Sequence, residues 1–126
     1  LKISIKLKKI KNKKVICLVV ARKNSVGLKN KNILKVRGEP LIYWTFKSAK
    51  NSKYIDKIFV STDCPIITRV SKKYGAIHIK RPKKLANNKA LGEHVYEHGY
   101  FEIKKMLDLS AENIEFIFET LFLKLF

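Results

Sequence analysis

The segment at residues 22–32 has the residue types of a phosphate-binding loop. Arg22, Lys29 and Lys31 offer positive charge to phosphate oxygens. Gly27 and the small Ser25 permit a turn whose backbone N–H groups point at an anion. The spacing matches neither GxGxxG nor the P-loop pattern. Residue types therefore predict a phosphate-binding loop here, and the alternative is an ordinary surface loop made basic by abundant lysine.

Two other polar segments also follow apolar runs in the chain. Thr62 and Asp63 come after the run at residues 57–61, and Arg81 and Pro82 come after residues 76–79. In an open parallel sheet the ligand sits beyond the carboxyl ends of the strands. We therefore expect these two segments to lie beside residues 22–32 at one edge of a sheet.

The apolar pattern predicts alternating strands and helices. Residues 15–21 are continuously apolar, as in a strand that is covered on both faces. Further strands are predicted at residues 57–61, 76–79 and 114–118. Three helices are predicted. The first opens at Pro40 and ends at Asn51 and Ser52, and the third covers residues 90–107. The second follows Asp63 and is closed by Gly75, and its apolar face consists of Ile66, Ile67, Val70 and Tyr74. This alternation predicts an α/β fold with a parallel sheet.

The composition indicates one folded, strongly basic domain. The 126 residues carry 28 Lys and Arg against 10 Asp and Glu, and 46% of the residues are hydrophobic, which excludes a disordered polycation. Of the 28 basic residues 24 are Lys, a bias typical of an AT-rich coding sequence. Specific nucleic-acid readout favours Arg and stacking aromatics. We therefore predict no specific nucleic-acid partner, and a Lys-rich nucleic-acid-binding module stays as the less favoured alternative.

The remaining composition bears on localisation. Residues 1–14 carry seven Lys and no acid, which predicts a solvated basic leader. A run of about 18 apolar residues, the length of a membrane span, does not occur. Cys17 and Cys64 lie far apart without CxxC spacing, which excludes a disulfide-dense scaffold and a cysteine zinc cluster. These observations predict a cytoplasmic protein with no membrane partner.

The order of five motifs resembles a known family. The segment ARKNSVGLKNKN at residues 21–32 resembles ARGGSKGIPGKN, the nucleotide-binding signature of cytidylyltransferases that activate acidic sugars, namely acylneuraminate cytidylyltransferases and their KDO relatives. The later motifs keep the family's order: GEPLIYWTF at 38–46, STD at 61–63, KKYGA at 72–76 and RPKKLA at 81–86. The resemblance implies a Rossmann-like nucleotide-diphospho-sugar transferase fold with a parallel or mixed sheet.

The resemblance also implies an activity and a site. Such enzymes transfer CMP from CTP to an acidic sugar and release pyrophosphate, with Mg²⁺ bridging phosphate oxygens. Arg22 and Lys31 are the implied catalytic residues because they would steady the leaving group. Metal ligands are not assigned in this chain. The motif positions that imply nucleotide binding are Arg22, Ser25, Gly27, Lys31, Asn32, Asp63 and Arg81.

The chain departs from the family pattern in the loop and at its end. Lys23 and Asn24 replace two glycines, Val26 replaces a lysine and Lys29 replaces a proline. The family continues after the fourth strand with a segment like LLQPTSP, where this chain reads FETLFLKLF. We therefore expect residues 15–126 to be the nucleotide-binding part of a truncated cytidylyltransferase, whose full-length relatives can form homodimers. The alternative is a non-catalytic remnant that at most binds nucleotide.

The histidine and tryptophan side chains could bind a ligand or could be structural. His94, Glu97 and His98 match the HxxEH pattern of zinc enzymes, but we favour an amphipathic helix with Val95, Phe101 and Ile103 inward. His78 is predicted to be structural within a strand. Trp44 is predicted to lie in the core.

Overall fold

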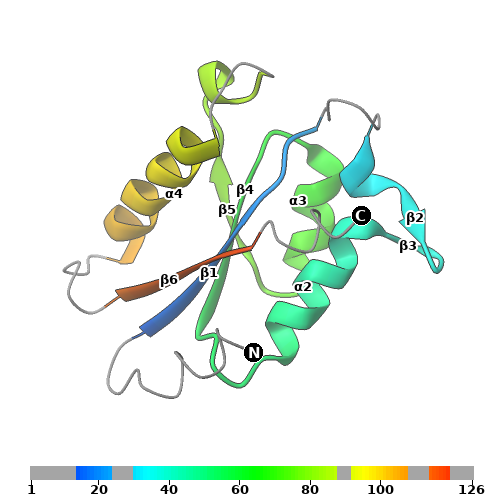
Figure 1. Ribbon diagram of the computed structural model, residues 1–126, viewed down its shortest axis with the longest axis horizontal. Coiled ribbons are helices and arrows are strands. Elements are labelled where there is room, and N and C mark those ends of the chain that lie inside the picture. The colour runs from blue at the N-terminus through cyan, green and yellow to red at the C-terminus, as the bar shows by residue number, and fades with distance from the viewer. Residues whose placement is uncertain (1–13, 24–29, 88–91, 108–113, 120–126) are drawn as a thin grey trace.

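The computed structural model describes residues 14–23, 30–87, 92–107 and 114–119 (Figure 1). The predicted leader, except Lys14, lies outside these residues. In chain order the elements are β1 (Lys14–Val20), η1 (Lys31–Ile33), β2 (Lys35–Val36), β3 (Glu39–Pro40), α2 (Leu41–Asn51), β4 (Lys57–Thr62), α3 (Pro65–Lys72), β5 (Ile77–Lys80), η2 (Lys83–Leu85), α4 (Gly92–Leu107) and β6 (Ile114–Glu119).

The main sheet has four parallel strands in the order β5-β4-β1-β6. β1 lies between β4 and β6, and its residues from Val15 to Val19 are all buried. A strand that is covered on both faces requires a continuous apolar run, which is what this segment contains. The predicted parallel α/β sheet is confirmed, with strand ends that differ by one residue from those expected.

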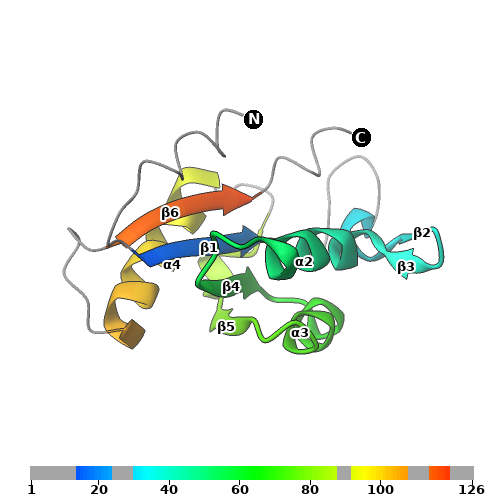
Figure 2. The ribbon, with the colours of Figure 1, turned by 90° about the horizontal axis from the view of Figure 1, so that it is seen from below.

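Helices cover the sheet on both faces. In Figure 1, α4 lies on one side of the sheet and α2 and α3 lie on the other, and Figure 2 shows the strands between these layers. Alternate residues of β1 point into the two cores. Cys17 and Val19 pack with α2 and α3, and the other face of β1 packs with α4. The second cluster contains Ile16, Leu18, Phe59, Ile79 and Ile103.

Three apolar side chains that were expected to be buried are not. Ile66 is 41% exposed and Phe101 is 51% exposed. Trp44 is only partly buried, and its Nε1 donates to the carbonyl oxygen of Val36 at 3.0 Å. The predictions of burial for these three side chains were therefore wrong.

A small antiparallel hairpin of β2 and β3 was not predicted. Its two-residue turn holds Arg37 at φ 52° and Gly38 at φ 81°. Positive φ at both central residues is typical of the tight turns that suit the twist of a hairpin. The hairpin escaped prediction because its two strands have only two residues each. Gly75, which also has a positive φ of 72°, closes the turn after α3, as predicted.

Gly99 allows α4 to approach β1 closely. A Cβ atom at this position would lie 2.6 Å from Cδ2 of Leu18, which is fully buried. Gly99 itself is buried in α4. The distance between α4 and the sheet therefore depends on the missing side chain.

We expect Gly99→Ala to lower the free energy of unfolding by about 1–3 kcal/mol, because the added methyl overpacks the contact with Leu18. Gly92→Ala is the matched control, since a Cβ there meets nothing within 4 Å. Urea denaturation of both variants measures the difference. Equal stabilities would show that the contact tolerates the methyl group.

Candidate functional site

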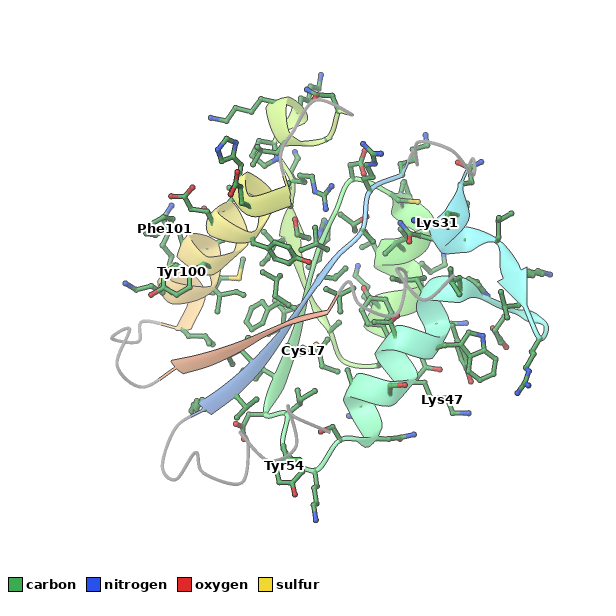
Figure 3. All side chains as sticks on the ribbon, viewed as in Figure 1. Cys17, Lys31, Lys47, Tyr54, Tyr100 and Phe101 are labelled. Atoms are coloured by element: carbon green, nitrogen blue, oxygen red, sulfur yellow. The ribbon has the colours of Figure 1, made fainter. Side chains whose placement is uncertain are left out.

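The three polar segments lie at one edge of the sheet, as predicted. Arg22 follows β1, Asp63 follows β4 and Arg81 follows β5. The three strands are parallel neighbours, with Val20 paired to Ser61 and Thr62 paired to Lys80. Lys31 lies on η1, beyond the carboxyl end of β1 (Figure 3). Ser25 and Gly27 lie outside the described residues.

Arg81 is held by the end of β4. Its side chain is 6% exposed, with Nη2 donating to the carbonyl oxygen of Ser61 at 2.8 Å and Nε donating to Ser61 Oγ at 3.3 Å. Burial lowers the pKa of Arg81, and nearby Asp63 opposes this shift. Two of its donors are thus engaged within the protein. Arg81 joins the ends of β4 and β5 and places a buried positive charge at the edge.

Ser61 is a site residue that the sequence interpretation missed. It is fully buried, and its carbonyl oxygen also accepts the backbone N–H of Ala21 at 3.1 Å. This residue therefore connects the segment after β1 with Arg81 after β5. The sequence does place Ser61 in the STD motif at residues 61–63, but only the charged Asp63 of that motif was predicted as a site residue.

Asp63 is bonded to the start of the loop that follows β1. Its Oδ1 accepts the backbone N–H of Lys23 at 2.7 Å, although the residue is exposed. The next residue, Cys64, is buried, and its N–H donates to Thr62 Oγ1. The carboxylate thus binds the backbone immediately after Arg22.

Asn32 connects the two ends of the loop. It is 5% exposed, and its Nδ2 donates to the carbonyl oxygen of Arg22 at 3.2 Å. Its Oδ1 is buried without a hydrogen-bond partner among the described residues. Burial of an unsatisfied acceptor costs about 1–3 kcal/mol. Among the described residues, the side-chain amide of Asn32 thus has an engaged donor, Nδ2, and an acceptor, Oδ1, without a partner.

Arg22 points toward the segment that follows η2. Its Nη1 lies 3.5 Å from the carbonyl oxygen of Asn87, a long hydrogen bond. Arg22 also lowers the pKa of Arg81, so the two cations are near each other. An edge that gathers positive charge in this way is suited to an anion.

The described residues do not fit a Mg²⁺ site by themselves. Within the described ranges, groups of three or more His, Cys, Asp or Glu that could hold a metal are absent. Asp63 is a carboxylate at the edge, but its Oδ1 already accepts Lys23 N–H. The described residues therefore supply no complete ligand set for the Mg²⁺ that the family resemblance implies.

The histidines of α4 line a cavity that also includes Asn87, the residue that Arg22 contacts. His94 and Glu97 are exposed, and His98 is partly buried with Nδ1 lacking a partner among the described residues. The cavity of about 600 Å³ is lined by Lys84, Leu85, Asn87, His94, Glu97, His98 and Phe101. The inward residues Val95 and Ile103 are buried as expected. His78 lies in β5, with Nε2 3.1 Å from the carbonyl oxygen of Thr62.

Comparison with known families identifies the chain. A family described as "Cytidylyltransferase" matches residues 16–112. The chain belongs to the cytidylyltransferase family. An N-acylneuraminate cytidylyltransferase of Escherichia coli O18:K1:H7 is 38% identical over 77 residues, which cover 61% of this chain and 18% of the relative. A CMP-N,N'-diacetyllegionaminic acid synthase of Campylobacter jejuni is 36% identical over 108 residues, which cover 85% and 43%.

This cytidylyltransferase chain spans less than half the length of these relatives. Two solved structures share its fold. The CMP:2-keto-3-deoxy-manno-octonic acid synthetase complexed with CTP superposes with a TM-score of 0.58 at 20% identity, over 83% of this chain and 39% of its own. A cytidylyltransferase from Leptospira borgpetersenii gives 0.59 at 19% identity, over 84% and 41%. They confirm the predicted Rossmann-like α/β fold.

Among the residues that the structure describes, no helix is long and apolar enough to cross a membrane.

We expect Arg81→Lys to lower the free energy of unfolding by about 1–3 kcal/mol, because an ammonium cannot reproduce both guanidinium bonds to Ser61. Arg69→Lys on the exposed surface of α3 is the control, with a change within about 0.5 kcal/mol. Thermal unfolding followed by circular dichroism measures both. An Arg81→Lys variant as stable as the control would contradict an anchoring role for Arg81.

Proposed function

We propose that this chain binds CTP at the carboxyl edge of β1, β4 and β5. In this proposal residues 15–126 form the nucleotide-binding part of an enzyme that transfers CMP to an acidic sugar of the sialic acid or KDO type. The proposal rests on Arg22 and Arg81, which follow neighbouring parallel strands at one edge of the sheet, and on Lys31 in the segment that follows β1. The names of the relatives support it, since they act on N-acylneuraminate or form a CMP-linked acidic sugar.

The proposed roles follow from charge and position. Arg22 and Lys31 would bind the triphosphate, whose charge a cationic edge neutralises. Ser25 and Gly27 would let the backbone approach the phosphates. The buried Oδ1 of Asn32 would accept a hydrogen bond from the nucleoside. Arg81 would add positive charge from within the protein, since two of its donors are bound to Ser61.

In the transfer step, the hydroxyl oxygen of the sugar attacks the α-phosphorus of CTP. The bond from that phosphorus to the bridging oxygen of the leaving pyrophosphate breaks, and the hydroxyl proton is released. Negative charge grows on the pyrophosphate, so Arg22 and Lys31 would stabilise the transition state most strongly there. We assign nucleotide binding to this chain and transfer to the longer enzyme, since the chain covers 18% to 43% of the relatives.

The buried thiols of Cys17 and Cys64 suit a reducing compartment. We therefore place the protein in the cytoplasm, where CTP is available.

We expect Arg22→Ala and Lys31→Ala each to weaken binding of MgCTP by about tenfold, because each removes a charge-assisted contact to phosphate. Isothermal titration calorimetry of the 126-residue chain measures the affinities. Lys53→Ala is the matched control: Lys53 is exposed near the amino end of β4, with its Nζ 5.2 Å from the ring centroid of Tyr54. Wild-type protein that fails to bind MgCTP would refute the proposal.

The same protein distinguishes the nucleic-acid alternative. A Lys-driven module would bind any DNA duplex with a steep salt dependence, and Lys53→Ala would weaken that binding as much as Arg22→Ala does. For MgCTP we expect Arg22→Ala to weaken binding and Lys53→Ala to leave it unchanged. Competition of duplex DNA against MgCTP at two salt concentrations separates these cases.

A further inference from the structure

Two aspartates hold β1 from the two ends of β4. Before β4, Asp56 Oδ2 accepts the backbone N–H of Val15 at 2.6 Å. After β4, Asp63 Oδ1 accepts the backbone N–H of Lys23 at 2.7 Å. Each carboxylate thus bonds to a backbone group of the neighbouring segment at a point where the strand pair begins or ends. The two contacts are chemically alike but lie at opposite ends of the strand pair.

Of the two, Asp63 lies among the cations of the proposed nucleotide site. It favours the charged form of Arg81, and it holds the backbone of the residue next to Arg22. A carboxylate that faced a triphosphate directly would repel it. The Asp63 carboxylate instead bonds to the backbone next to Arg22 and favours the charged form of Arg81.

Ser61 binds the backbone on the other side of Arg22, at Ala21. It binds Arg81 through both its carbonyl oxygen and its hydroxyl, and its carbonyl oxygen also accepts the N–H of Ala21. Ser61 near the end of β4 and Asp63 just after it therefore bind the backbone on either side of Arg22, and Ser61 also binds the side chain of Arg81. These contacts hold the backbone at Arg22 in a fixed position relative to the side chain of Arg81.

We infer that Asp63 is a positioning residue, which holds Lys23 and thereby Arg22 in place beside Arg81, and which contacts neither the nucleotide nor a metal ion. The inference rests on the proposed CTP site and changes the role that the sequence resemblance implied for Asp63. It separates two properties of the side chain. The oxygen that accepts Lys23 N–H is required, and the negative charge is not.

Three variants test these properties separately. Asp63→Asn keeps an oxygen acceptor and removes the charge, whereas Asp63→Ala removes both. Asp56→Ala removes the matching contact to Val15 at the opposite end and controls for a general loss of stability. For each variant, amide hydrogen exchange of Lys23 and Val15 is measured by NMR, and MgCTP affinity is measured by calorimetry.

We expect Asp63→Ala to speed exchange of the Lys23 amide by about tenfold or more and to weaken MgCTP binding by about fivefold. Asp63→Asn should keep Lys23 exchange within about threefold of the wild type and tighten MgCTP binding about two- to fivefold at low salt, because a like charge is removed. Asp56→Ala should speed exchange at Val15 and change the MgCTP affinity by less than about twofold.

Loss of MgCTP binding in Asp63→Asn with slow Lys23 exchange would overturn the inference, because the carboxylate charge would then be needed by the ligand or its metal. Unchanged Lys23 exchange in Asp63→Ala would overturn it as well. Wild-type protein that does not bind MgCTP would refute the proposed function instead. In that case the exchange of Lys23 would still decide whether Asp63 holds the backbone next to Arg22.

Discussion

The hydrogen bonds at the carbonyl oxygen of Ser61 join three strands at the edge where the candidate site lies. This atom accepts the N–H of Ala21 and the Nη2 of Arg81. Because Ser61 is fully buried in β4, the segments after β1 and β5 take their positions from the strand between them. The side chain of Arg81 and the backbone at Ala21 are thereby held in fixed positions relative to each other by the fold alone.

This junction depends in turn on a sheet that is covered on both faces. β1 is buried between α4 on one side and α2 and α3 on the other, and Gly99 permits α4 to lie against Leu18. The apolar run that begins in β1 ends at Ala21, directly before Arg22 at the edge of the candidate site. Arg81 is the exception, since it carries a charge into the buried region, and its bonds to Ser61 together with the nearby Asp63 offset the cost of burial.

Much of the fold could be predicted because the strands are continuous apolar runs and the helices are amphipathic. The run at residues 15–21 is short, continuously apolar and rich in Val and Ile, which favours a covered strand over a buried helix. The β2–β3 hairpin could not be predicted, since its strands are too short to show a periodic pattern. The exposure of Ile66 and Phe101 was also unpredictable, because the width of a helix's buried face depends on the angle at which it meets the sheet.

The amino-acid sequence by itself determined the residue types at the site, their order after three strands and the family to which they belong. Only the tertiary structure decided which atoms are already engaged: Arg81 on Ser61, Asp63 on Lys23 and Asn32 on Arg22. The partners of Asp63 and Arg81 lie 40 and 20 residues away in the sequence. Strand register, which is a property of the folded sheet, brings such distant groups within hydrogen-bond distance and so assigns each one its role.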